Sequence, residues 1–206
     1  MLKWIAVLLA VLLSSAAHAG PLDDCAQERD LDRRVRGCTD RIREFPGDAT
    51  AYFNRGKAYL SLGEVDRAIA DHTRVIQLDS WYAAAYFERG VAYERKEQLE
   101  RAVGDYGKAI EINPRYAAAF AARAAAHLKV GQAAQALGDA ERAVDLEPLD
   151  AGFLDTRGHV YEALGRTQDA VGDYRRVLAM DPSNQSAIDG LRRLRASPSS
   201  QTAFPR

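Results

Sequence analysis

Small and apolar residues recur along this chain with a period of 34 residues. Self-similarity at a fixed period of this length is typical of proteins built from stacked repeats. The pattern is clearest at two small positions, which are occupied by Gly56, Gly90, Ala124 and Gly158 and by Ala68, Ala102, Ala136 and Ala170. The sequence therefore predicts four copies of one structural unit, beginning at Ala49, Ala83, Ala117 and Ala151.

Each unit contains two stripes of apolar and small residues separated by a break. Counted from the first residue of the unit, one stripe occupies positions 4, 8 and 11 and the other occupies positions 20, 24 and 27. Steps of three and four residues place each stripe on one face of a helix. Proline at position 32 ends the second helix of three units, at Pro114, Pro148 and Pro182. Each unit is therefore predicted to be a helical hairpin, whose small residues at positions 8 and 20 allow its helices to approach closely.

This pattern resembles the tetratricopeptide repeat, in which aromatic, small and proline residues recur at the same spacings. The match extends over residues 49–182 without an insertion, although position 7, usually leucine in the family, is arginine here. The resemblance implies an all-α fold, a right-handed superhelical solenoid of about four hairpins with a capping helix at each end. The expected segments are a signal peptide (1–19), an N-terminal cap with a half repeat (20–48), four repeats (49–82, 83–116, 117–150 and 151–184), a C-terminal capping helix (185–195) and a disordered tail (196–206).

Two charged residues occupy the same positions in all four units, arginine at position 7 and aspartate at position 23. Both positions lie on the apolar stripes, so both charges face packed surface, where a charge needs a partner. The flanking half units have Gly37 and Leu191 at the corresponding positions, so pairing between units would leave Arg55 and Asp173 without partners. We therefore predict structural ion pairs within units, which are Arg55 with Asp71, Arg89 with Asp105, Arg123 with Asp139 and Arg157 with Asp173.

Residues 1–19 have the pattern of a secretory signal peptide. Lys3 precedes an apolar run from Trp4 to Leu13, which is too short for a typical membrane span. The small-residue site at Ala17 to Ala19 is typical of cleavage before Gly20. The sequence therefore predicts a periplasmic or secreted protein that is not inserted in a membrane after cleavage.

The two cysteines, Cys25 and Cys38, then lie in an oxidising compartment, where a disulfide persists. We expect a bond between them to hold the N-terminal cap against the half repeat, with a stabilisation of roughly 3 kcal/mol from loop closure. A redox or metal-binding pair is the alternative, but the spacing is not that of a CxxC motif and no histidine lies nearby.

Composition narrows the class of partner. The chain has a formal net charge of −1, and removal of Lys3 with the signal peptide leaves 27 basic and 29 acidic residues, from 28 and 29 in the whole chain. This balance gives no electrostatic footprint for nucleic acid. The sequence contains no nucleophile elbow, glycine-rich phosphate loop or HExxH motif, so neither a catalytic activity nor a cofactor is predicted.

Asp155, His159 and Glu162 share one face of the first helix of the fourth unit. An imidazole and two carboxylates suit zinc or iron. A small enzyme or metal-binding protein centred on these residues is therefore the alternative function. The other interpretation is a polar patch on a solvated or ligand-facing surface.

The first helices of tetratricopeptide arrays line a concave groove, so the resemblance implies that positions 2, 5, 6, 9, 12 and 13 face a ligand. Chaperone-binding members have lysine at position 5 and asparagine at position 9 of one repeat, where this chain has Phe53 and Lys57. We expect a scaffold or adaptor for a protein or peptide ligand, and the groove suits an extended or helical peptide with apolar side chains at one end and a basic or polar group at the other. Binding on the convex face within a larger assembly is a further interpretation. The expected groove residues are Phe53, Asn54, Lys57, Phe87, Glu88, Val91, Arg95, Lys129, Asp155, His159 and Glu162.

Overall fold

Every regular element in the described part of the chain is an α-helix. The computed structural model describes residues 21–26 and 29–196, so the expected signal peptide and the tail beyond Ala196 lie outside these residues. Within the described residues there are eleven helices and no strand. The helices are α1 (Pro21–Ala26), α2 (Leu31–Glu44), α3 (Ala49–Ser61), α4 (Val65–Leu78), α5 (Ala83–Arg95), α6 (Leu99–Ile112), α7 (Ala117–Lys129), α8 (Ala133–Leu146), α9 (Ala151–Ala163), α10 (Thr167–Met180) and α11 (Gln185–Ala196).

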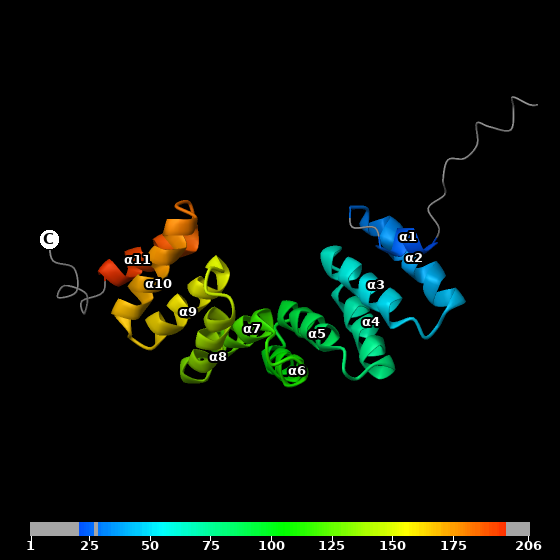
Figure 1. Cartoon of the computed structure of the whole chain (residues 1–206), viewed down its shortest axis with the longest axis horizontal. Helices are drawn as coiled ribbons and strands as arrows, with labels where there is room; N and C mark the ends of the chain where they lie inside the picture. The colour runs from blue at the N-terminus through cyan, green and yellow to red at the C-terminus, as the bar shows by residue number, and fades with distance from the viewer. Residues whose placement is uncertain (1–20, 27–28, 197–206) are drawn as a thin grey trace, which may run out of the picture.

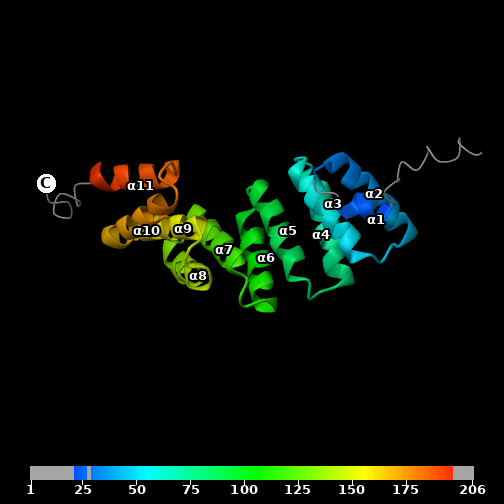
Figure 2. The same cartoon turned by 45° about the horizontal axis from the view of Figure 1, so that its top comes forward.

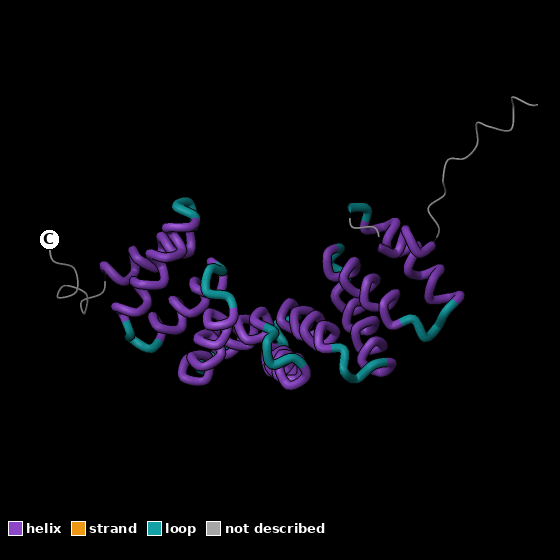
Figure 3. Tube along the Cα trace, in the orientation of Figure 1, coloured by secondary structure: helices purple, strands orange, loops and turns teal. Residues whose placement is uncertain are grey.

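The helices pack as successive hairpins along an arch (Figure 1). Helices α3 to α10 form the four repeats, while α1 with α2 and α11 lie at the two ends (Figure 2). At the centre of the arch, α5 and α7 lie on the inner side and α6 and α8 on the outer side, with short loops between them (Figure 3). This is the all-α solenoid that the repeat pattern predicts, and its inner surface belongs to the first helices of the hairpins.

The turn inside each hairpin requires a residue in the left-handed backbone region. Gly63, Gly131 and Gly165 fill this place with φ of 79°, 78° and 71°. The second hairpin has Glu97 there, with φ of 58°. Glycine has no Cβ to clash in this region, so the backbone strain is confined to Glu97.

Replacing Glu97 with glycine is therefore expected to stabilise the protein by about 0.5 to 1 kcal/mol, since relief of left-handed strain outweighs the extra chain entropy of glycine. Glu97 is exposed, so its side chain has little packing to lose. Urea unfolding followed by circular dichroism measures the change. The matched control, Gly131→Glu, should destabilise the protein, and a lower urea midpoint for Glu97→Gly would contradict this assignment of strain.

Glycine at position 8 makes room for a ring from the second helix of the same hairpin. A Cβ added at Gly90 would lie 2.6 Å from Cε1 of Tyr106, closer than side chains approach one another. The side chain nearest to position 8 is therefore at position 24, whereas the sequence suggested the small residue at position 20. The third hairpin has Ala124 and Ala140 instead, and both are fully buried. The other glycine–ring pairs are Gly56 with His72 and Gly158 with Tyr174.

Each arginine at position 7 binds the aspartate at position 23 of its own repeat. Arg55 donates two hydrogen bonds to Asp71, both 2.8 Å long. It also donates to Thr39 of the preceding helix at 3.1 Å, and Arg89 donates to Thr73 in the same way at 3.2 Å. These bonds to threonine join neighbouring repeats and were not predicted. The remaining two-bond pairs are Arg89 with Asp105, Arg123 with Asp139 and Arg157 with Asp173.

The N-terminal cap consists of α1 and α2 joined by a disulfide between Cys25 and Cys38, the bond that the sequence predicts. Helix α1 crosses α2 closely at Gly37, where an added Cβ would lie 2.5 Å from Cβ of Asp24. This crossing explains why glycine occupies the position at which the four repeats have aspartate. The short α1 thus takes the place of a full first helix.

The C-terminal cap is α11, which ends at Ala196, one residue beyond the predicted boundary. The side chain of Asn184 accepts a hydrogen bond from the backbone N–H of Ala187 and so caps its first turn. Its apolar residues Ala187 and Leu194 are buried against the fourth repeat. No helix in the described part of the chain has the length and apolar character needed to cross a membrane.

Candidate partner-binding surface

Two pairs of aromatic side chains lie one repeat apart, each formed by a predicted groove residue and a tyrosine that was not predicted. The rings of Phe53 and Tyr82 are 5.0 Å apart, and those of Phe87 and Tyr116 are 5.1 Å apart. Tyr82 and Tyr116 are the N-cap residues of α5 and α7, so each pair lies at the boundary between one repeat and the next. All four side chains are half-buried. We call the surface made by these four residues the aromatic surface.

Another ring supports each phenylalanine from the second helix of its hairpin. Phe53 contacts His72 of α4 edge-on, with ring centroids 5.6 Å apart. Phe87 lies 5.7 Å from Tyr106 of α6. Each predicted anchor is therefore held between two aromatic neighbours, which limits its rotation before any ligand binds.

His72 is fully buried beneath the aromatic surface. Neither of its ring nitrogens has a hydrogen-bond partner among the described residues. Burial is the main cause that lowers the pKa of His72 to about 4, and the positive charges of Arg89 and Lys57 lower it further. The imidazole is consequently neutral at neutral pH and serves as a flat support for Phe53.

Charged side chains surround the first aromatic pair. Lys57 is exposed, with Nζ 5.8 Å from the ring centroid of Phe53. Arg95 is also exposed and donates a hydrogen bond to the backbone carbonyl of Leu60. Burial raises the pKa of Glu88, while attraction to Lys57 and Arg95 partly offsets that rise. Two cations and one half-buried carboxyl leave this region with a positive balance.

Two further predicted groove residues, Val91 and Asn54, lie beside other parts of the fold. Val91 is partly buried against the core cluster that contains Tyr106. Asn54 and Thr50 line a cleft of about 180 Å³ whose other side includes Cys25 of α1. The disulfide-linked cap therefore extends the surface on which Asn54 lies.

Lys129 is bound within the protein. Its Nζ lies 2.5 Å from one carboxylate oxygen of Glu94, and the hydroxyl of Tyr106 donates to the other oxygen at 2.8 Å. Burial, together with the hydrogen bond to Glu94, raises the pKa of Tyr106 well above its ordinary value. These three residues join α5, α6 and α7, so Lys129 bridges two repeats.

The cluster of Asp155, His159 and Glu162, which the sequence places on one helix face, forms hydrogen bonds with the C-terminal helix α11. Ser186 of α11 donates to Asp155 at 2.8 Å and lies 2.9 Å from Nε2 of His159. Arg193 of α11 donates two hydrogen bonds to Glu162, at 2.7 and 2.9 Å. Much of the hydrogen-bonding capacity of the cluster is thereby used inside the protein.

Tyr174 of α10 completes this network. Its hydroxyl donates to Glu162 at 2.8 Å and lies 2.9 Å from Nδ1 of His159. Hydrogen bonds from Arg193 are the main cause that lowers the pKa of Glu162. Burial alone would raise the pKa of Asp155, but hydrogen bonds from His159 and a serine hydroxyl outweigh it and lower the pKa. Both carboxyls are therefore ionised and paired at neutral pH.

This geometry does not favour the metal-binding alternative. Both ring nitrogens of His159 already face hydroxyl groups, and the guanidinium of Arg193 lies against Glu162. A metal ion would have to displace these groups beside an existing positive charge. The described residues contain no group of three or more histidine, cysteine or acidic side chains placed to hold a metal ion. We interpret the cluster as the contact that fixes α11.

Tyr82 and Tyr116 were not among the predicted groove residues. Both occupy position 34, the residue before the next repeat, where the later units have Asp150 and Asn184. Those two residues accept hydrogen bonds from the following helix, whereas the tyrosines make no side-chain capping bond. Tyrosine in place of a capping residue was the signal that could have identified the aromatic surface.

Three family models match parts of the chain. The tetratricopeptide repeat model matches residues 83–116, and a TPR repeat model matches residues 56–97. A model of the bacterial transcriptional activator domain matches residues 108–184. No curated protein matches the chain.

Solved structures share the architecture. The crystal structure of MamA is 23% identical, with 76% of this chain and 92% of that chain covered and a TM-score of 0.69. YrrB, named as a TPR protein with an unusual peptide-binding site, is 23% identical, with 82% and 95% covered and a TM-score of 0.66. The first TPR of Spaghetti (RPAP3), bound to the HSP90 peptide SRMEEVD, is 30% identical, with 56% and 91% covered and a TM-score of 0.54. The similarity to MamA and YrrB shows a shared fold alone, whereas the Spaghetti domain is also similar in sequence.

Proposed function

The chain belongs to the tetratricopeptide repeat family, and from that premise we propose that it is a non-enzymatic scaffold whose aromatic surface holds an extended segment of a partner protein. Proteins of similar architecture bind peptides, since YrrB is named for a peptide-binding site and the Spaghetti domain holds an HSP90 peptide. The observation that carries the proposal is the repetition of one aromatic pair in two successive repeats.

Repeated aromatic pairs suit an extended ligand for two physical reasons. Aromatic side chains supply large contact areas, and a few such anchors usually dominate the affinity of an interface. The rings are already held in place by His72 and Tyr106, so little side-chain entropy is lost on binding. A partner segment that places one apolar side chain on each repeat would use both pairs.

The charges favour an acidic group between the apolar side chains of the partner. Lys57 and Arg95 are exposed beside the aromatic surface, and Glu88 offsets only one of them. At the other end of the array, Asp155 and Glu162 are already bound by α11. The expectation of a basic group in the ligand therefore loses its support, and an acidic segment becomes the better match.

Export from the cytosol is part of the same proposal. The pattern of residues 1–19 is that of a signal peptide, and a disulfide such as Cys25–Cys38 persists in oxidising compartments. A periplasmic or secreted scaffold would meet its partner there. Mass spectrometry of protein from the culture medium and the cell envelope tests this by locating the first residue of the mature chain.

Replacing Phe53 and Phe87 together with alanine is expected to weaken partner capture at least about thirtyfold, since the loss of even one central aromatic anchor typically costs about 2 kcal/mol or more. Affinity capture from envelope extracts identifies the partner, and titration of the purified partner measures the loss. The helical circular dichroism spectrum should stay intact.

Two further variants make this result interpretable. Leu149→Ala with Met180→Ala removes exposed apolar side chains elsewhere and should leave capture unchanged. Lys57→Glu with Arg95→Glu reverses two exposed charges, removes the hydrogen bond from Arg95 to Leu60, and should weaken capture most strongly at low salt. Unchanged capture by both the phenylalanine and the charge variants would refute binding at the aromatic surface and point to the convex face.

A further inference from the structure

A hollow lined by an exposed tryptophan lies away from the aromatic surface. The turn that joins α4 to α5 lies at the outer, lower edge of the arch in Figure 1. The hollow forms where this turn meets the end of α6 and has a volume of about 410 Å³. Trp81 in the turn is 76% exposed. The hollow is lined by Ser80, Trp81, Tyr86, Lys108, Glu111 and Ile112. We call this hollow the outer slot.

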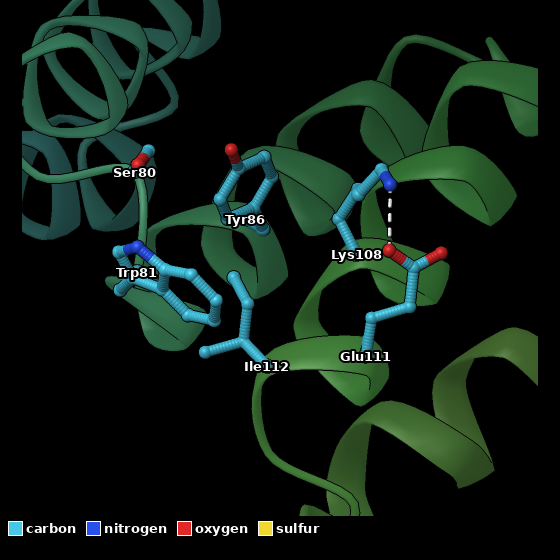
Figure 4. A pocket seen from close by; sticks show the side chains of 6 residues that line it. All are labelled: Ser80, Trp81, Tyr86, Lys108, Glu111 and Ile112. Carbon is cyan, nitrogen blue, oxygen red and sulfur yellow. Dashed lines mark hydrogen bonds and ion pairs between the residues drawn. The ribbon is translucent and has the colours of Figure 1, made fainter.

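The outer slot has aromatic and aliphatic walls. Figure 4 shows the side chains of Trp81, Tyr86 and Ile112 converging from the turn, α5 and α6. Lys108 and Glu111 lie beyond them, with Nζ and a carboxylate oxygen 2.6 Å apart. The apolar side chains thus form a patch rather than one isolated exposed residue, and the nearest two charges cancel.

Three residues that line the outer slot carry side-chain hydrogen-bond donors without partners among the described residues. Among the residues that the structure describes, none accepts a hydrogen bond from the side chains of Ser80, Trp81 or Tyr86. The indole N–H only donates, and the two hydroxyl groups donate or accept. A ligand that presents acceptors to the slot would therefore satisfy groups that otherwise bind only water.

We propose that the outer slot binds a proline-containing extended segment of a partner protein. Such segments adopt the polyproline II conformation, whose rings pack on aromatic side chains and whose carbonyl oxygens have no internal hydrogen bonds. Those carbonyls match the free donors of Trp81 and Tyr86. Proline brings no backbone N–H that would need an acceptor. Lys108 and Glu111 neutralise each other's charge, so an uncharged segment of the partner suits the outer slot.

The equivalent turn between the third and fourth repeats lacks these features. Leu149 there is 82% exposed and lines a hollow of about 320 Å³ together with Glu147, Pro148 and Asp150. That lining has two carboxylates and no aromatic ring. The proposed ligand therefore fits the turn at Trp81 specifically, and its binding is independent of a partner at the aromatic surface.

Fluorescence of Trp81 tests the proposal directly. Trp4 and Trp81 are the two tryptophans of the chain, and Trp4 lies in the proposed signal peptide, so Trp4→Phe leaves Trp81 as the single reporter whether or not that peptide is removed. Titration of the full chain with a decaproline peptide should give a saturable blue shift, and a glycine–serine peptide of equal length should give none. The absence of a saturable shift with decaproline, or an equal shift with both peptides, would overturn the proposal.

Three variants relate the signal to the outer slot. Tyr86→Phe keeps the ring but removes one donor, and it should weaken decaproline binding about three- to tenfold, the value of one hydrogen bond. Trp81→Ala, measured by calorimetry, should abolish binding. Leu149→Ala is the matched control and should leave the affinity unchanged. Parental affinity in both the Tyr86 and the Trp81 variants would overturn the assignment.

Two other occupants would give different results. Deletion of residues 197–206 removes Pro198 and Pro205. If decaproline binds more tightly after this deletion, the chain's own tail occupies the outer slot, and the proposal is overturned. A dimer in sedimentation that Trp81→Ala dissociates would overturn it in favour of a second copy of the chain. A monomer with unchanged affinity after the deletion supports a partner protein.

Discussion

Replacing Arg89 with alanine is expected to lower the free energy of unfolding by about 3 to 5 kcal/mol, because it leaves the buried carboxylate of Asp105 without its counter-charge. Arg89 donates two hydrogen bonds to that carboxylate, at 2.7 and 2.8 Å. It also donates to Thr73 of the preceding repeat. The loss should therefore loosen two neighbouring repeats, since repeat stability depends on the interfaces between units.

Urea unfolding followed by circular dichroism measures this effect. Replacing the whole pair, Arg89→Met with Asp105→Leu, should cost much less than Arg89→Ala, because no unpaired charge stays buried. Lys108→Ala breaks an exposed ion pair in the same hairpin and should change stability very little. Equal losses for the single and the paired replacement would show that the two charges act independently.

The fold and the ion pairs could be predicted because the same information occurs four times in the chain. A single Arg55 and Asp71 would have given no reason to choose one pairing over another. Four copies of the pair, flanked by half units that lack it, indicate pairing within each unit. Gly37 and Leu191 stand at the equivalent positions of the half units, so pairing between units would leave one arginine and one aspartate without partners. Repetition thus identifies the contacts that all repeats share.

The candidate site could be predicted only in part, because it depends on residues in which the repeats differ. The repeat pattern predicts that Phe53 and Phe87 lie on the inner face of their helices. It does not predict the two tyrosines that pack against them. Asp155 and Glu162 appeared available to a ligand, since Ser186 and Arg193, which bind them, lie in α11, outside the repeated segment. Periodicity contains no information about such contacts at the ends of the array.

Replacing Tyr174 with alanine is expected to lower the free energy of unfolding by about 3 to 5 kcal/mol, as truncation of a large buried ring does. The ring is fully buried, and Cβ atoms added at Gly158 and Gly190 would lie 2.7 and 2.5 Å from it. Its hydroxyl also binds Glu162. Because the ring fills the space between α9 and α11, hydrogen exchange should rise most in α11. Urea unfolding and amide exchange measure the two effects.

The third repeat supplies the control for this prediction, because it has alanine at both equivalent positions, 124 and 140. Gly158→Ala alone should destabilise the protein, since the new methyl group collides with the ring of Tyr174. In the Tyr174→Ala background the same methyl group enters vacated space and should restore part of the lost stability. The two substitutions should therefore be strongly non-additive. Tyr174→Phe, which removes only the hydroxyl, should cost about 1 to 2 kcal/mol. Additive losses for Gly158→Ala and Tyr174→Ala would contradict direct packing of the ring on Gly158.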